Sequence, residues 1–196
     1  MHPSPELAND VLAWVDPGVG RFERALLLDR DGVINVKIDD GYVLDFDRDF
    51  RLIDAFERAM APFCDARIPA VIVSNQSCVG RGLIGREAMR EVMTRVIAAL
   101  RSRGIRIAGY VICPHAPDAR CACRKPEPGL LFEAERRFGI RLGESAFIGD
   151  SATDATAGER AGCPTFLVDA ADEARYFLAF EQAYRLTAAP LRVGNE

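Results

Sequence analysis

Residues 26–35 read Leu-Leu-Leu-Asp-Arg-Asp-Gly-Val-Ile-Asn, and this stretch organises the rest of the chain. An apolar run that fits a buried strand ends in two carboxylates, Asp29 and Asp31, and Gly32 follows at once. Buried aspartate is rare without a partner, so an Asp-x-Asp-Gly sequence at the end of a strand needs a reason. We interpret the two aspartates as a phosphate-handling pair. A turn or a helix cap is the alternative, because Asp and Gly are common turn residues.

Short apolar runs and helix-period segments alternate along the chain. The predicted strands are continuous apolar runs, which is typical of strands buried on both faces: 25–28, 70–73, 109–112, 146–148 and 165–168. The predicted helices carry an apolar stripe between them: 53–65, 86–103, 129–138, 154–161 and 171–186. This order predicts an α/β fold with a doubly wound parallel sheet. Ligands of such sheets bind beyond the carboxyl ends of the strands.

The length of 196 residues suits one domain. Residues 1–24 are punctuated by proline and glycine, and we expect an N-terminal extension laid over the domain. Residues 25–170 form the expected domain, and residues 171–196 supply a C-terminal helix and tail. A monomer is the default expectation, because the extension could cover part of the surface.

The composition excludes several classes of function. A formal net charge of −4 gives no support to binding of nucleic acid or anionic membranes. No apolar run approaches the length of a membrane span, and the N-terminus lacks the pattern of a signal peptide. We therefore expect a cytoplasmic protein whose six cysteines are thiols or metal ligands. The chain has only two histidines, His2 and His115, which disfavours a histidine-based acid/base mechanism.

Residues capable of phosphate chemistry follow the other predicted strands. Residues 74–77, Ser-Asn-Gln-Ser, offer a hydroxyl and backbone N–H donors to a phosphoryl group, with a plain polar loop as the alternative. Arg124 is a planar fork and Lys125 a point charge for phosphate, unless they are a solvated basic pair. Asp150 could join Asp29 in holding Mg²⁺, which prefers oxygen ligands, or it could cap a helix.

A cysteine–histidine cluster lies in the loop after the third predicted strand. Cys113, His115, Cys121 and Cys123 form the pattern Cys-x-His-x5-Cys-x-Cys. A Cys3His set is a closed tetrahedral zinc site, and closed sites are structural. Buried thiols and a redox pair are the alternatives. Zinc would stiffen a loop over residues 113–125 and orient the two basic residues at its end.

These motifs resemble the haloacid dehalogenase-like (HAD) phosphatases. The four catalytic motifs of that family match Asp29-Arg30-Asp31-Gly32, Ser74, Lys125 and Gly149-Asp150. The zinc loop narrows the resemblance to the histidinol-phosphate and heptose-bisphosphate phosphatases. Further similarity to the heptose branch lies in residues 31–35 with 41–43, in residues 74–77 with 81–82, and in residues 123–129. Residues 36–40 look about two residues longer than the segment of that branch.

The resemblance implies a nearly capless fold and a role for each matched residue. Asp29 would be the nucleophile that forms an aspartyl-phosphate, and Asp31 the general acid and base. Ser74 and Lys125 would stabilise the transferring phosphoryl group. The implied ligand sets are Asp29, Asp31 (through its carbonyl) and Asp150 for Mg²⁺, and Cys113, His115, Cys121 and Cys123 for Zn²⁺. The implied substrate contacts are Asp39, Asp40, Gly41, Tyr42, Ser74, Asn75, Gln76, Ser77, Arg124 and Lys125.

The leading functional hypothesis is therefore an Mg²⁺-dependent phosphomonoesterase acting on a small sugar phosphate. A heptose 1,7-bisphosphate is the expected substrate, with histidinol phosphate as the alternative. A non-catalytic zinc-stabilised interaction module is a second hypothesis, and the five retained catalytic positions oppose it. A polynucleotide phosphatase is the third, and the acidic net charge disfavours it.

Overall fold

The computed structural model describes residues 11–38 and 41–190. These residues form a six-stranded sheet with the order β1-β4-β3-β2-β5-β6. Strands β2 to β6 run parallel to their neighbours, and β1 runs antiparallel to β4. The strands are β1 (Leu12–Val15), β2 (Leu26–Leu28), β3 (Ala70–Asn75), β4 (Ile107–Cys113), β5 (Ala146–Gly149) and β6 (Thr165–Leu167).

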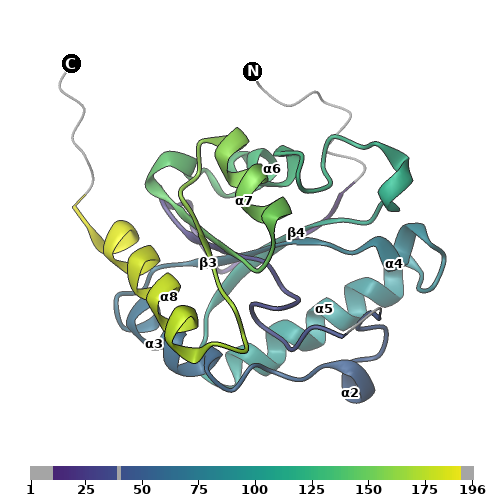
Figure 1. Ribbon diagram of the computed structural model, residues 1–196, viewed down its shortest axis with the longest axis horizontal. Coiled ribbons are helices and arrows are strands. Elements are labelled where there is room, and N and C mark those ends of the chain that lie inside the picture. Colours follow the sequence, from purple (N-terminus) through teal and green to yellow (C-terminus); the bar gives the residue numbers. More distant parts are fainter. Residues whose placement is uncertain (1–10, 39–40, 191–196) are drawn as a thin grey trace.

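Helices cover both faces of the sheet (Figure 1). One face carries α6 (Gly129–Phe138) and α7 (Ala152–Ala161), and the other carries α3 (Phe56–Asp65), α5 (Arg86–Arg101) and α8 (Glu173–Ala188). Each face has its own apolar core, because strands buried on both sides present side chains to both layers. The shorter helical segments are α2 (Phe46–Asp49), α4 (Ser77–Gly80), η1 (Pro117–Ala119) and η2 (Leu142–Glu144).

The five predicted strands and five predicted helices are all present, with ends that shift by up to a few residues. The predicted burial on both faces is confirmed for β2, β3, β4 and β5. It is wrong for β6, which is half-exposed because it lies at the edge of the sheet.

Strand β1 is the main departure from the sequence-based prediction. Residues 12–15 fall in the segment expected to lie over the domain, yet they extend the sheet itself by pairing with β4. Trp14 stacks on Tyr110 of β4 at 6.5 Å between ring centroids, and Arg101 lies over the Trp14 ring. The sheet is therefore mixed, with one antiparallel strand at its edge.

The strand order creates a crevice above the carboxyl end of β2. The chain runs from β2 outward to β3 and β4, then returns to the other side of β2 for β5 and β6. Such a reversal is the topological switch point at which open α/β sheets bind ligands. The residues that follow β2, β3 and β5 therefore meet at one edge. Among the described residues, no helix is long and apolar enough to cross a membrane.

Candidate active site

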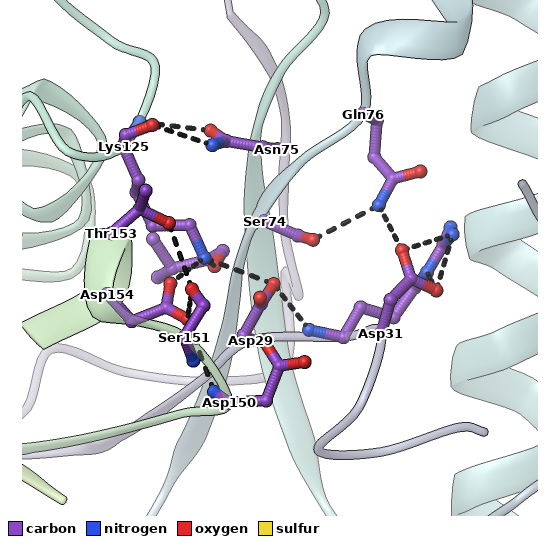
Figure 2. Close-up of polar contacts among 12 residues, drawn as sticks. Asp29, Asp31, Ser74, Asn75, Gln76, Lys125, Asp150, Ser151, Thr153 and Asp154 are labelled. Carbon is purple, nitrogen blue, oxygen red and sulfur yellow. Dashed lines mark hydrogen bonds and ion pairs between the residues drawn. The ribbon is translucent and has the colours of Figure 1, made fainter. Parts of the chain in front are cut away.

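Asp29 and Lys125 form the centre of this edge (Figure 2). Asp29 follows β2, and its Oδ1 lies 3.1 Å from the Lys125 Nζ. The same Nζ lies 2.6 Å from the Oδ1 of Asp154, which is in the first turn of α7. The Lys125 side chain is 2% exposed and Asp154 is fully buried. The ammonium group is thus a buried counter-ion shared by two carboxylates.

Asn75 fixes the backbone that carries Lys125. Its side-chain amide donates to the Lys125 carbonyl at 3.0 Å and accepts from the Lys125 N–H at 3.1 Å. The Lys125 ammonium also donates to the Val73 carbonyl at 3.1 Å and lies over the Phe147 ring. A loop far along the chain is in this way bound to the end of β3. Asn75, predicted to contact substrate, has a positioning role toward Lys125 in this structure.

The Asp31 carboxylate is held by three side chains. Arg30 donates to both carboxylate oxygens at 2.9–3.1 Å, Asn35 donates to Oδ1 at 2.9 Å, and Gln76 donates to Oδ2 at 2.9 Å. Burial alone would raise the pKa of Asp31, but the Arg30 charge and these hydrogen bonds outweigh it and lower the pKa. Gln76 also donates to the Ser74 hydroxyl at 3.1 Å, so the Ser74 and Asp31 positions are linked.

Asp29 has the opposite electrostatic setting. Burial raises its pKa to about 6, and the neighbouring Asp154 charge adds to the rise, while Lys125 lowers it. A divalent cation would relieve this penalty, because it favours the ionised carboxylate. The two predicted catalytic aspartates therefore differ in their surroundings. A further cation would stabilise the charge on Asp29, whereas the buried Arg30 already balances the charge on Asp31.

Asp29, Asp150 and Asp154 place carboxylate oxygens within 4.8 Å of one another, a donor set that suits Mg²⁺. Asp154 has other partners: Lys125, and the N–H groups of Asp150 and Ser151 at 3.2 and 3.1 Å. It supports the loop, as its capping box at the start of α7 requires. Asp29 and Asp150 thus remain as the carboxylates of the predicted magnesium set.

Gly32 makes room for Asp150. Its φ of 86° lies in the region that favours glycine, and a Cβ atom there would lie 2.3 Å from the Asp150 Oδ2. The Lys37 ammonium lies 2.7 Å from the same Oδ2. Lys37 was not among the residues predicted for the site.

The four predicted zinc ligands converge. Distances between their donor atoms are 3.1–3.6 Å for the five pairs in contact, from Cys123–Cys113 at 3.1 Å to Cys113–Cys121 at 3.6 Å. Zinc bonds of about 2.0–2.3 Å at tetrahedral angles separate donors by roughly 3.4–3.8 Å. A hydrogen bond from the Cys123 thiol lowers the pKa of Cys113 to about 6, which favours a thiolate. The donor chemistry and spacing fit a tetrahedral zinc ion.

The predicted substrate-contacting residues divide into three groups. Most of them line a cavity of about 290 Å³ together with Asp29, Asp31 and Asp150. Gln76 is fully buried behind this wall, and Asp39 and Asp40 lie outside the described residues. The predicted residues that line the cavity are Gly41, Tyr42, Ser74, Asn75, Ser77, Arg124 and Lys125.

Two contacts orient the cavity wall. The Tyr42 and Ser77 hydroxyls lie 3.1 Å apart, and Arg124 donates to the His115 carbonyl at 3.4 Å. The latter contact connects the zinc loop directly to a basic side chain of the cavity.

Sequence reasoning missed Arg30 and Asn35, which hold Asp31, and it missed the ion pair between Asp154 and Lys125. The sequence did contain a signal for Arg30. An arginine at the end of a buried strand needs a carboxylate partner, and Arg30 has an aspartate on either side. The contact between Asp154 and Lys125 joins residues on different strand connections, and residue spacing does not encode it.

Comparisons with known proteins agree on one family. A profile described as HAD-hydrolase-like matches residues 122–183. The D-glycero-beta-D-manno-heptose-1,7-bisphosphate 7-phosphatase of Photorhabdus laumondii is 39% identical over 137 residues, which cover 66% of this chain and 71% of that protein. The corresponding alpha-named enzyme of Burkholderia mallei is 34% identical over 74% of this chain and 79% of its own.

Solved structures give the same result. The D,D-heptose 1,7-bisphosphate phosphatase of B. bronchiseptica, solved with magnesium and phosphate, superposes with a TM-score of 0.68 at 33% identity, covering 74% of this chain and 80% of its own. A HAD-like phosphatase of Mesorhizobium loti superposes with a TM-score of 0.74 at 31% identity, covering 93% and 98%. The chain belongs to the HAD-like phosphatases and is a relative of the heptose-1,7-bisphosphate 7-phosphatases.

Proposed function

We propose that this chain is an Mg²⁺-dependent phosphomonoesterase that removes the 7-phosphate of D-glycero-D-manno-heptose 1,7-bisphosphate. The observation that carries the proposal is the convergence of Asp29, Lys125 and Asp150 at the switch point of the sheet. Relatives named for this reaction, at 33–39% identity, support the substrate. Both beta- and alpha-named relatives match at similar identity, so the proposal covers the heptose and leaves both anomers to the assay.

Asp29 is the proposed nucleophile. Its carboxylate oxygen attacks phosphorus, the bond from phosphorus to the sugar oxygen breaks, and an aspartyl-phosphate forms. Water then attacks this phosphorus, the acyl-phosphate P–O bond breaks, and inorganic phosphate leaves with Asp29 regenerated. Lys125 lies at hydrogen-bond distance from Asp29, so its charge is in place to stabilise the phosphoryl oxygens in both steps. The Ser74 hydroxyl donates to the same group.

Asp31 is the proposed proton carrier. It gives a proton to the leaving sugar oxygen and takes one from the attacking water. Its lowered pKa means that the carboxyl group is ionised at neutral pH in the state described here. Donation requires the protonated form, so we expect Asp31 to give up part of its contact with Arg30, Asn35 and Gln76 when substrate is bound.

Two metals complete the proposal. Asp29, Asp150 and the Asp31 carbonyl would hold Mg²⁺, which supplies positive charge opposite the phosphate oxygens. Cys113, His115, Cys121 and Cys123 would hold a structural zinc ion, which stiffens the loop that carries Arg124 and Lys125. Arg124 and the Gly41–Tyr42 segment would contact the sugar, together with Asp39 and Asp40.

The decisive experiment is a steady-state phosphatase assay on the magnesium- and zinc-loaded protein. The substrates are both anomers of heptose 1,7-bisphosphate, and histidinol phosphate. We expect the highest kcat/KM for a heptose bisphosphate. A preference for histidinol phosphate would assign the chain to that branch, and no hydrolysis of any phosphomonoester would support the non-catalytic module.

We also propose a monomeric protein of the cytoplasm that binds neither nucleic acid nor membrane. The expected division is an N-terminal segment 1–24, a phosphatase domain 25–170 and a C-terminal segment 171–196. The net charge of −4 supports the expected absence of nucleic-acid and membrane binding. Sedimentation analysis of the purified protein tests the oligomeric state.

A further inference from the structure

A second and larger cavity opens directly beside the catalytic one. Its volume is about 1060 Å³, and four residues line both cavities: Lys37, Ile38, Gly41 and Tyr42. The two spaces are thus separated by a shared wall rather than by a layer of the fold. The outer cavity therefore adjoins the space in front of Asp29 along these four residues.

The outer cavity is lined by cationic side chains that the proposed chemistry does not use. Among the described residues that line it, Arg81 and Lys37 are cationic and Asp118 is acidic. Within residues 11–38 and 41–190, no partner forms a hydrogen bond or ion pair with the Arg81 guanidinium. An exposed guanidinium beside a cavity, with no hydrogen-bonded carboxylate among the described residues, suits a phosphate or another anion.

The segment that carries Arg81 is rigidly mounted. Arg81 follows α4 directly, and its backbone N–H donates to the Ser77 carbonyl at 2.9 Å. The preceding Gly80 packs so closely on the zinc loop that a Cβ atom would lie 2.4 Å from the Ala116 N and 2.8 Å from the Pro114 carbonyl. The outer cavity therefore lies between α4 and the zinc loop, and the backbone of Arg81 is held against both.

Lys37 connects the outer cavity to the magnesium carboxylates. Its ammonium lies 2.7 Å from the Asp150 Oδ2, while its side chain is 58% exposed. A metal ion on Asp150 and an ammonium on the same oxygen repel each other. The flexible four-carbon stem allows the ammonium to move to another anion at little cost.

We propose that Lys37 and Arg81 bind the second phosphate of the bisphosphate, the one that is not transferred, in this outer cavity. Lys37 contacts Asp150 in the structure, and its ammonium would contact the retained phosphate instead when Mg²⁺ and substrate are bound. The proposal rests on the proposed function, because it takes Asp29 as the acceptor of the transferred phosphate. It explains why a cationic residue lines both cavities.

Binding to a non-turnover protein tests the subsite. In the Asp29→Asn background with Mg²⁺, calorimetry compares heptose 1,7-bisphosphate with heptose 7-phosphate, which lacks the retained phosphate. We expect Arg81→Gln and Lys37→Met each to weaken bisphosphate binding about tenfold, since hydrogen bonds to charged groups contribute that much. Binding of heptose 7-phosphate should change less than about twofold. The matched control, Arg103→Gln, removes an exposed arginine of the remote pair with Glu57.

A second measurement, of Mg²⁺ binding, tests whether Lys37 exchanges between Asp150 and the retained phosphate or only adds positive charge to the cavity. Without substrate, Lys37→Met should bind Mg²⁺ several-fold more tightly than wild type, because the competing ammonium is gone. Lys37→Arg keeps the charge and should not show this gain. The opposite signs, tighter metal and weaker bisphosphate, identify a residue that alternates between the two anions. Unchanged or weaker Mg²⁺ binding in Lys37→Met would overturn the exchange.

The outcomes distinguish the subsite from the reaction. If wild type hydrolyses the bisphosphate but the Arg81 and Lys37 variants lose affinity equally for both ligands, the subsite is rejected and the reaction stands. If wild type hydrolyses neither ligand and the Asp29→Asn protein binds neither, the proposed function itself is wrong.

Discussion

The two metal-ligand clusters of this protein differ in how their charge is balanced. The cysteine–histidine cluster is built from eleven consecutive residues, and its donor atoms contact one another. The carboxylate cluster combines residues from separate strand connections, and Lys125 and Lys37 already lie on it. The donor spacing of the first cluster fits a zinc ion. The second is balanced in part by protein cations.

Breaking the nucleophile should have the largest effect. Asp29→Asn keeps the volume of the side chain but removes the attacking carboxylate, so turnover should fall by about 10⁴-fold or more. Steady-state kinetics with the heptose bisphosphate measures the loss. Zinc content should stay at one ion per chain, and the exposed Asp54→Asn control should retain full activity. Near-wild-type turnover of Asp29→Asn would reject the assignment.

Removing the shared buried cation should have the next largest effect. Lys125→Met leaves Asp154 and Asp29 buried without their counter-ion, which should cost about 3–5 kcal/mol of unfolding free energy. Transition-state stabilisation should fall by about 3 kcal/mol as well. Denaturant titration and kcat/KM measure the two losses.

A double variant sharpens this result. Adding Asp154→Asn to Lys125→Met removes one stranded charge and should restore part of the stability, but none of the activity. The exposed pair between Arg160 and Glu127 offers the control, since Arg160→Met should cost less than about 1 kcal/mol. Equal stability losses at the two sites would contradict the buried counter-ion.

The pH dependence of stability should expose the unmet charge on Asp29. Its folded pKa of about 6 lies above the ordinary 3.8, so the folded state holds this proton more tightly. In the metal-free protein, this group therefore lowers stability as pH rises from about 4 to about 6. Asp29→Asn should be more stable than wild type at pH 7.5, by at most about 3 kcal/mol, and equal to it near pH 4.

Magnesium should reverse that order, because it binds the folded wild type and adds stability by mass action. Thermal unfolding at both pH values, with and without Mg²⁺, makes the comparison. A wild-type protein that is the more stable of the two at pH 7.5 without metal would show that Lys125 and Lys37 neutralise the cluster fully.

The smallest expected effect on catalysis comes from the zinc site. Cys121→Ser should reduce zinc from about one ion per chain to a small fraction, measured by elemental analysis. We expect kcat/KM to fall only about tenfold, because Asn75 still holds the Lys125 backbone when the loop loosens. Cys64→Ser lies outside the cluster and should leave both values unchanged. A zinc-free protein with full activity would show that zinc binding does not contribute to the position of Lys125.

The parts of the fold that the sequence predicted are those with strong local patterns. The buried parallel strands and the amphipathic helices follow from apolar runs and from 3.6-residue periodicity. Strand β1 was missed because residues 12–15 are a short segment between proline- and glycine-rich stretches, and its identity depends on pairing with β4 almost a hundred residues away.

In the candidate site too, the features that depend on local sequence patterns were predicted. The zinc ligands were readable because their spacing is local, and the strand-end aspartates because parallel strands end at one edge. The partner of each polar side chain was not readable. Asn75 ends β3 and Gln76 follows it, and their side chains point in opposite directions: Asn75 binds the Lys125 backbone, and Gln76 binds Asp31. Such choices depend on three-dimensional neighbours.

Strand β1 has a consequence for how the protein is handled in solution. Without it, β4 would be an open edge of seven buried residues, Ile-Ala-Gly-Tyr-Val-Ile-Cys, ready to pair with another chain. Gly109 lets β1 approach closely, since a Cβ atom there would lie 2.2 Å from the Trp14 carbonyl oxygen. A shortened chain that begins at residue 25 would keep every proposed catalytic and zinc-binding residue. We nevertheless expect the shortened chain to self-associate, because β1 no longer pairs with the edge of β4.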